Sequence, residues 1–189
     1  MRLSLLKITM KKIIGLVGKI ASGKGTAAKY LTEKYNAKSY RFSTPLRDIL
    51  KRLYLEINRE NMQKISTILR KNLEENILAK VISEDVKEDA NEMIVIDGIR
   101  RLADIEYLIK LPEFKLIYIT ADAKNRYERL ITRGENEDDK NKTFEQFMRD
   151  HEAETELEIP LVASQADYRI DNNGDLNNLH KRLAKIINA

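Results

Sequence analysis

The sequence predicts an α/β fold with a parallel sheet, because short apolar segments alternate with amphipathic stretches along the chain. The short segments are typical of buried strands, whereas apolar residues three and four positions apart are typical of helices. The 189 residues contain no internal repeat, low-complexity tract or linker. We therefore expect one domain over residues 10–189, which is long enough to bury an ordinary core.

Five segments are predicted to be strands. The first, KKIIGLVG, is an apolar run that ends in glycine, and the third, EMIVID, is the clearest strand in the chain. The second, KSYRF, is less apolar. In chain order, the predicted strands are 11–18, 38–42, 92–97, 115–120 and 167–171.

Helices are predicted between the strands from apolar spacing and from residues that favour helix ends. The first runs over 24–35. Thr44 and Pro45 resemble an N-cap followed by proline at the first helical position. Asn58 can cap the next helix, in which a long amphipathic stripe runs on as far as Ile82.

The C-terminal half carries the same signals. Asp122 is predicted to cap a helix after the fourth strand, and Asp175 to cap the terminal helix. Thr143 and Gln146 form a candidate capping box. The segment before that box, GENEDDKNK at 134–142, has no apolar residue and predicts an exposed loop.

The composition argues against several classes of protein. Cysteine is absent, which excludes disulfides and thiolate metal sites and suits a reducing cytoplasm. The net charge of +4 is spread over both signs, without the basic stripe and interleaved aromatic residues of a nucleic-acid binder. No apolar run approaches the roughly 20 residues of a membrane span. We therefore expect a cytoplasmic protein that binds neither nucleic acid nor membranes.

The first residues, MRLSLLKITMKK, lack the long apolar core and the small-residue cleavage site of a signal peptide. MKKIIGLVG, which begins at Met10, leads directly into the first predicted strand. Residues 1–9 are therefore expected to be an N-terminal extension.

The turn after the first strand, within GLVGKIASGKGT at 15–26, matches a phosphate-binding loop. Glycines let backbone N–H groups curl around phosphate oxygens, the following helix adds a partial positive charge, and Lys24 adds a full one. Gly25 displaces the hydroxyl that usually follows the lysine to Thr26. The expected nucleotide-binding residues of the loop are Gly18, Ala21, Ser22, Gly23, Lys24, Gly25 and Thr26.

Asp97 ends the third predicted strand, and the carboxyl ends of parallel strands face the ligand crevice. Next to the phosphate loop, this carboxylate can hold Mg²⁺ through water, since hard cations prefer oxygen ligands. The Thr26 hydroxyl is a second candidate ligand. The plainer interpretation of Asp97 is a strand-end acid that caps a turn.

Arg126, Arg129 and Arg133 follow one another at helical spacing and share roughly one face. Phosphoryl transfer needs such cations, because charge spreads over the transferring oxygens. For Arg126, a solvated face paired with acids such as Glu128 is the preferred interpretation. Arg129 and Arg133 are candidate catalytic residues of a mobile lid over about 126–150, with the polar loop as its tip.

GKGT at 23–26 resembles the phosphate loop of the nucleoside monophosphate kinases, and of the adenylate kinases most closely. FSTPLRDIL at 42–50 is similar to the start of their acceptor-binding helix, VIDGIRR at 95–101 to their Asp-Gly strand end, and RLITR at 129–133 to their lid arginines. ADYRIDNNG at 166–174 looks instead like dephospho-CoA kinase near its adenine-binding turn. The likeness spans about residues 11–188.

The resemblance implies a P-loop three-layer fold with a five-stranded parallel sheet flanked by helices, an acceptor-binding region over about 44–88, and a lid. It implies ATP and Mg²⁺ as cofactors. The catalytic residues would be Lys24, Asp97, Arg101, Arg129 and Arg133. Asn173 and Gly174 would bind the nucleotide, and Ser43, Thr44, Arg47 and Arg101 the acceptor. Arg47 departs from the family, whose arginine would lie two residues later.

Three classes of function fit a phosphate loop. A GTPase-type switch needs an Asn-Lys-x-Asp motif, whereas NKTF at 141–144 ends in phenylalanine. A non-catalytic nucleotide-binding protein is disfavoured by the intact Lys24, Asp97 and Arg101. An ATP-dependent phosphotransferase that acts on a small nucleotide is therefore expected.

The nature of the acceptor depends on whether a base is present. A hydroxyl acceptor must lose its proton, usually to a carboxylate, and the first acid after the second strand is Asp48, inside a helix. A monophosphate is already an oxyanion and needs only cations. We therefore expect a nucleoside or deoxynucleoside monophosphate kinase. Dephospho-CoA kinase, favoured by DNNG at 171–174, is the alternative. The accepted base and the oligomeric state stay open.

Overall fold

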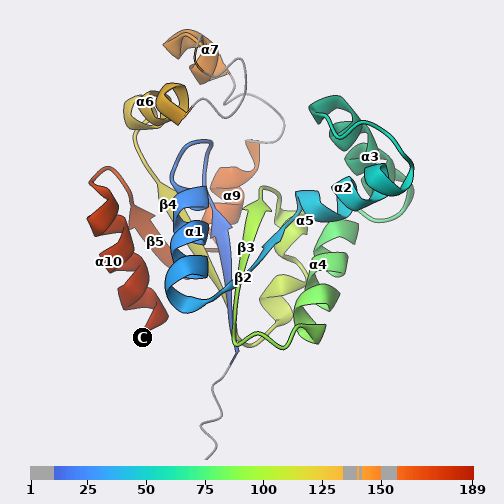
Figure 1. Ribbon diagram of the computed structural model, residues 1–189, viewed down its shortest axis with the longest axis horizontal. Helices are drawn as coiled ribbons and strands as arrows, with labels where there is room; N and C mark the ends of the chain where they lie inside the picture. Colours follow the sequence, from blue (N-terminus) through green and yellow to red (C-terminus); the bar gives the residue numbers. More distant parts are fainter. Residues whose placement is uncertain (1–10, 134–139, 141, 150–156) are drawn as a thin grey trace, which may run out of the picture.

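The computed structural model describes residues 11–133, 140, 142–149 and 157–189. Five parallel strands form one sheet in the order β2-β3-β1-β4-β5 (Figure 1). This confirms the predicted α/β class and the five-stranded parallel sheet. The strands are β1 (Lys12–Val17), β2 (Lys38–Arg41), β3 (Met93–Ile99), β4 (Phe114–Thr120) and β5 (Tyr168–Asp171).

Helices connect the successive strands, as parallel pairing requires. The first helix covers the predicted range of 24–35. The helices are α1 (Lys24–Tyr35), α2 (Ser43–Arg52), α3 (Arg59–Asn72), α4 (Ile77–Glu88), α5 (Leu102–Ile105), the short 3-10 helix η1 (Leu108–Lys110), α6 (Ala123–Arg133), α7 (Phe144–Arg149), α9 (Ile159–Ala163) and α10 (Leu176–Ile187).

The core has two parts, one on each face of the sheet. Successive side chains of a strand point to opposite faces, so Ile13 packs with α4, α5 and α9, whereas Ile14 packs with α1 and α10. The central strand β1 is buried along all but its first residue, because helices cover both of its faces. This double cover explains why the predicted strand at β1 is an apolar run.

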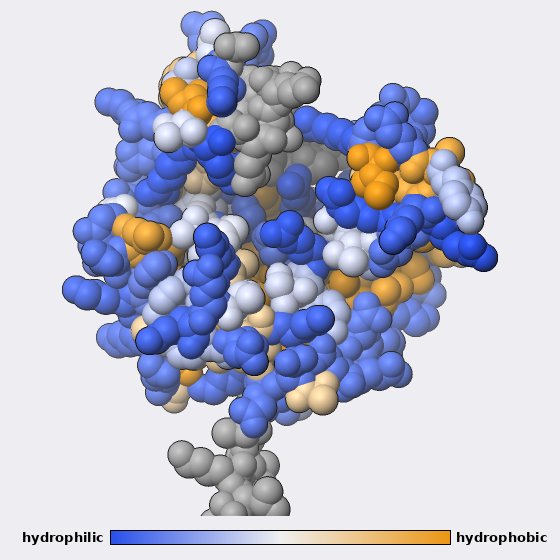
Figure 2. Space-filling model, in the orientation of Figure 1, coloured by the Kyte–Doolittle hydropathy of each residue, from blue (hydrophilic) through white to orange (hydrophobic). Residues whose placement is uncertain are grey.

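The acceptor-binding region expected over about 44–88 corresponds to α2, α3 and α4. Figure 1 shows α2 and α3 projecting beyond the sheet. The surface there is apolar on a face that is otherwise mostly hydrophilic (Figure 2). Its exposed apolar side chains include Leu53, Leu55, Ile57, Ile68 and Leu73.

The apolar stripe that runs on to Ile82 belongs to two helices, so a single helix over this stretch is wrong. Asn58 caps α3 as predicted, because its Oδ1 accepts a hydrogen bond of 2.9 Å from the N–H of Asn61. The chain leaves the helix at Leu73, whose φ is −112° and ψ is −96°. Apolar spacing can continue across such a turn, so the periodicity did not reveal the break.

The predicted cap at Thr44 is also wrong. Helix α2 begins at Ser43, directly after Phe42. The N–H of Phe42 donates to the carbonyl of Asp97 over 3.2 Å, and its ring is buried, so the chain passes from the strand ladder straight into the helix. Pro45 then lies in the first turn, where backbone N–H groups have no helical partner.

Two other predicted caps are confirmed. Asp175 Oδ1 accepts from the N–H of Asn178 over 2.8 Å. Thr143 and Gln146 form a reciprocal capping box, with hydrogen bonds of 2.8 and 3.2 Å. Helix α9 was not predicted, since its five residues are too few to show a period.

Some predictions lie outside the described residues, namely the extension over 1–9 and most of the loop 134–142. None of the described helices is long and apolar enough to cross a membrane.

Asp89, at the C-terminal end of α4, is held as a carboxylate by several donors. Its Oδ2 accepts from the Tyr40 hydroxyl over 2.6 Å, and its Oδ1 from the N–H of Asn91 over 2.7 Å. The bond from Tyr40, followed by those from Asn91, lowers the pKa of Asp89 from 3.8 to about 2, although burial opposes the shift. Burial and the bond to Asp89 both raise the pKa of Tyr40.

Replacing Tyr40 with phenylalanine is expected to destabilise the protein most near neutral pH. The pKa of Asp89 is lower in the folded state, so its contribution is complete above about pH 4 and is lost as the pH falls through about 2. We expect Tyr40→Phe to lower the free energy of unfolding by about 1 kcal/mol at neutral pH, and by less in acid. Urea unfolding at several pH values tests this; an equal loss at every pH would contradict it.

Candidate functional site

The phosphate-binding loop lies between β1 and α1, in the strand–loop–helix context that its motif requires. Ala21 and Gly23 have left-handed backbones, with φ of 58° and 109°. The Lys24 ammonium donates to the carbonyls of Gly18 and Lys19 over 2.5 and 3.0 Å, so it lies over the turn. Thr26, in the first turn of α1, is exposed.

Asn172, which follows β5, clamps this loop from the side. Its Nδ2 donates to the carbonyl of Ser22 over 2.8 Å, and its own carbonyl accepts from Arg129 Nη2 over 2.7 Å. Asn172 is buried, and its backbone N–H donates to the carbonyl of Thr120 over 2.8 Å. A Cβ added to Gly23 would lie 2.2 Å from Asn172 Nδ2, so the clamp requires glycine there.

Arg126 holds the loop from the α6 side. Its Nη1 donates to the carbonyl of Ile20 over 3.2 Å, its Nε donates to that of Ala121 over 3.0 Å, and its guanidinium lies 5.3 Å from the centre of the Phe147 ring. Arg126 is 5% exposed. The predicted solvated face is therefore wrong for this residue, because α6 packs it against the loop.

Sequence reasoning missed the parts that Arg126 and Asn172 play. The sequence singled out both neighbourhoods, because Arg126 shares a helical face with Arg129 and Asn172 belongs to the DNNG segment. Neither pattern indicated that the two side chains bind the carbonyls of Ile20 and Ser22.

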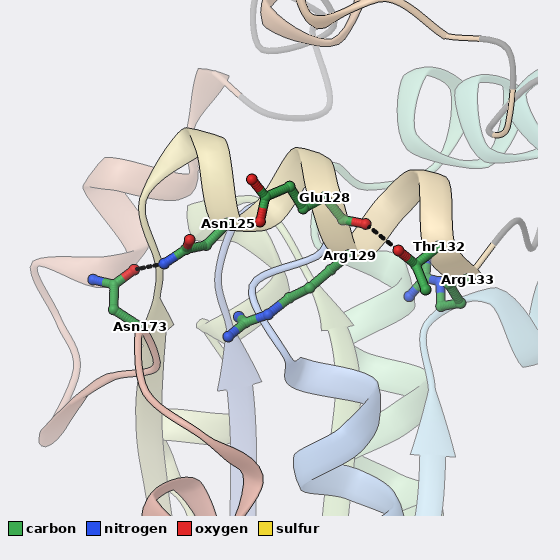
Figure 3. A pocket seen from close by; sticks show the side chains of 6 residues that line it. All are labelled: Asn125, Glu128, Arg129, Thr132, Arg133 and Asn173. Carbon is green, nitrogen blue, oxygen red and sulfur yellow. Dashed lines mark hydrogen bonds between the residues drawn. The ribbon is translucent and has the colours of Figure 1, made fainter.

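Two cavities open beside the loop, and Arg129 lines both. The larger, of about 440 Å³, lies along one face of α6 (Figure 3). It is lined by Asn125, Glu128, Arg129, Thr132, Arg133 and Asn173. The smaller, of about 130 Å³, adjoins the phosphate loop. It is lined by Gly23, Thr26, Arg129, Asn172, Gly174, Leu176 and Leu179.

In the part of the chain that the structure describes, the Arg129 guanidinium has one paired and one unpaired nitrogen beside these cavities. Its Nη2 is bound to Asn172, whereas its Nη1 is buried and has no hydrogen-bond partner among the described residues. Buried donors are nearly always paired, so an unpaired one favours a ligand that accepts from it. Asn173 Oδ1 accepts from Asp122 N–H and Asn125 Nδ2 over 2.8 and 2.9 Å, which ties the turn to α6.

Asp97 lies on the same side of the sheet as α1. Val95 packs in the core under α1, and side chains two positions apart in a strand share a face. The strand continues to Ile99, so Asp97 does not end it as predicted. Gly98, with a φ of 89°, permits the continuation. Asp97 Oδ1 accepts from the Gly98 N–H over 2.8 Å, a bond within β3 rather than at a turn after it.

The acceptor candidates lie on α2 and before α5. Ser43 begins α2 beside Asp97, whereas Thr44 and Arg47 are exposed on α2. Arg101 precedes α5, and its Nη1 lies 3.1 Å from Glu75 Oε1. Arg129 thus shares a cavity with Gly23, Thr26 and Gly174, whereas Arg101 lies against the α3–α4 connection and Ser43, Thr44 and Arg47 lie on α2.

The fold and the phosphate loop define a protein with a P-loop kinase-like fold. A family model described as an AAA domain matches residues 17–146. A UPF0200 protein of Methanococcus maripaludis is 31% identical over 184 residues, which are 94% of this chain and 99% of that protein. A UPF0200 protein of Thermococcus kodakarensis is 29% identical, over 93% of this chain and 96% of its own. The chain belongs to the UPF0200 family.

Solved structures share the fold. A shikimate kinase from Bacteroides thetaiotaomicron has a TM-score of 0.62 and 16% identity, over 94% of this chain and 99% of its own. TT1252 from Thermus thermophilus has a TM-score of 0.61 and 16% identity, over 95% and 97% of the two chains. The P-loop kinase resemblance of the sequence is thereby confirmed at the level of the fold.

Proposed function

We propose that this protein is an ATP-dependent phosphotransferase acting on a small nucleotide, and in particular a nucleoside or deoxynucleoside monophosphate kinase. The observation that carries the proposal is the cavity that the phosphate loop shares with Arg129. Arg129 lies there with one nitrogen fixed by Asn172 and the other buried and unpaired among the described residues. A phosphate loop next to a fixed cation suits a nucleoside triphosphate.

The donor would lie along α1 and the turn after β5. Lys24 and the first backbone N–H groups of α1 would bind its phosphates. Asn173 and Gly174, which line the cavities beside the loop, would contact the nucleoside. Arg129, which lines both cavities, would then contact the bound nucleotide.

A magnesium ion would take its protein ligands from oxygen groups near the phosphate loop. The Asp97 carboxylate, acting through water, and the exposed Thr26 hydroxyl would hold it. When bound, such an ion neutralises charge on the donor oxygens.

The protein's own residues would promote the transfer by positioning the two substrates and by stabilising charge. The bond between the γ-phosphorus and its bridging oxygen breaks, and ADP leaves with the electron pair. An oxygen of the acceptor's phosphate forms the new bond. Lys24 would stabilise the charge on the donor side and Arg101 would hold the acceptor. Arg129 and Arg133 would stabilise the charge on the transferring oxygens when the lid closes and excludes water.

Asp48 on α2 is the candidate base that a hydroxyl acceptor would need. Burial raises the pKa of Asp85 on α4, and the charges of Glu88 and Asp48 add to the shift. Asp48 therefore lies near enough to Asp85 on α4 for its charge to act there. A general base must reach the reacting oxygen itself, and an ionised phosphate needs none.

The experiment is an acceptor panel with Mg-ATP and ADP release as the signal. AMP, CMP, UMP, GMP and their deoxy forms are compared with dephospho-CoA and shikimate. We expect the fastest ADP release with one of the monophosphates. Dephospho-CoA kinase is the second candidate, because the DNNG turn that resembles that enzyme holds the loop through Asn172. Activity confined to dephospho-CoA, and abolished by Asp48→Asn, would overturn the monophosphate proposal.

Arg133→Ala is expected to lower turnover roughly 10- to 100-fold while changing acceptor affinity little, since a lid cation acts mainly in the closed complex. Arg133 ends α6 and lines the larger cavity. Steady-state kinetics and calorimetric binding measure the two effects separately. Lys124→Ala, an exposed change on the same helix, is the control. Unchanged turnover would show that Arg133 is only a surface charge.

A further inference from the structure

A buried ion pair joins the acceptor-binding region to the turn that carries Arg101. Arg70 on α3 and Asp104 on α5 are 9% and 2% exposed, and Arg70 Nη2 lies 2.7 Å from Asp104 Oδ1. Charged side chains are seldom buried unless they are paired and hydrogen-bonded. Neither residue takes part in the chemistry proposed above.

The Asp104 carboxylate holds the backbone of the two arginines that precede α5. Its Oδ2 accepts from the N–H groups of Arg100 and Arg101 over 2.9 and 3.0 Å. Helix α5 has only four residues, so few bonds of its own fix this turn. The direction in which the Arg101 side chain leaves the backbone therefore depends on Asp104.

The Arg70 guanidinium holds the loop that faces Arg101. Its Nη1 donates to the carbonyl of Glu75, and the Glu75 carboxylate lies 3.1 Å from Arg101 Nη1. The Arg70 guanidinium thus makes two contacts that bear on Arg101. It binds the Asp104 carboxylate, which accepts from the Arg101 backbone, and it binds the loop whose Glu75 pairs with the Arg101 side chain. An apolar pair of similar volume would fill the same space, often without loss of stability, but could not hold these backbone groups.

We propose that Arg70 and Asp104 are positioning residues that fix Arg101 for the phosphate of the acceptor. The inference rests on the proposed function, which gives Arg101 that phosphate to bind. Arg70, on α3, would act on the acceptor only through Arg101.

Arg70→Lys tests the proposal. Lysine keeps the charge, but its single nitrogen cannot reproduce the planar fork that reaches both Asp104 and the Glu75 carbonyl. We expect the KM for the acceptor to rise about tenfold and the KM for ATP to stay within about twofold. Lys115→Arg is the matched control: Lys115 lies 3.1 Å from Asp167, which also accepts from a backbone N–H, that of Leu116. Equal increases in both KM values would overturn the proposal.

A double-mutant cycle separates positioning from general support of the fold. If Arg70 acts through Arg101, Arg70→Lys adds nothing to the acceptor KM in an Arg101→Ala background. A full additional increase there, or an unchanged acceptor KM in Arg101→Ala alone, would overturn the inference.

Hydrogen exchange gives a readout that needs no activity, and so separates this inference from the proposed function. In Arg70→Lys, the N–H groups of Arg100 and Arg101 are expected to exchange about tenfold faster, because their acceptor is no longer held. The N–H of Leu116 should be unaffected. Unchanged exchange at Arg100 and Arg101 would overturn the inference, whereas an acceptor panel without activity would overturn the proposed function alone.

Discussion

Lys24→Ala is expected to leave a folded protein that has lost nearly all phosphoryl transfer. The ammonium lies over the phosphate loop, bound to two loop carbonyls, where a donor phosphate would meet it. Removal of one preorganised cation that stabilises a transition state costs about 3–4 kcal/mol, or a hundredfold to a thousandfold in rate. ADP release with the best acceptor of the panel measures the loss.

Lys29→Ala is the matched control for this variant. Lys29 lies on the same helix, but its side chain is 73% exposed and pairs only loosely, at 3.7 Å, with Glu33. The control should retain the wild-type rate, since such surface pairs contribute little. If Lys24→Ala kept more than about a tenth of that rate, the loop would not serve phosphoryl transfer.

The features that could be predicted from the sequence are those that nearby residues determine. The phosphate loop, the first helix and the caps at Asn58 and Asp175 all depend on residues within a few positions of one another. The central strands β1, β3 and β4 could be predicted because helices cover both faces of the sheet there, which makes these strands largely apolar. The failures at Thr44 and after Leu73 are failures of helix boundaries, where tertiary contacts override local preference.

The features that could not be predicted join residues far apart in the chain. Asn172 is 150 positions from Ser22, and Arg126 is 106 positions from Ile20. Arg70 and Asp104 are 34 positions apart, on helices whose packing the sequence does not reveal. A single charged or amide residue has no periodicity, so its sequence context cannot show whether it faces water or a buried carbonyl.

Gly23→Ala is expected to destabilise the protein and to weaken ATP binding, although it adds only one methyl group. Gly23 has a φ of 109°, and its added Cβ would lie 2.2 Å from Asn172 Nδ2. That nitrogen cannot move away freely, because it belongs to a buried residue that donates to the Ser22 carbonyl. Backbone strain and a broken buried hydrogen bond together should lower the free energy of unfolding by about 2–4 kcal/mol.

Gly25→Ala, two residues further on, is the matched control for stability. No atom lies within 4 Å of its added Cβ, and the position is inside the first turn of α1. Alanine there should leave the free energy of unfolding unchanged or raise it by up to about 1 kcal/mol, because it favours the helix. Urea unfolding of both variants, with ATP titration of Gly23→Ala, measures the contrast. Equal stabilities would mean that Asn172 does not clamp the phosphate loop.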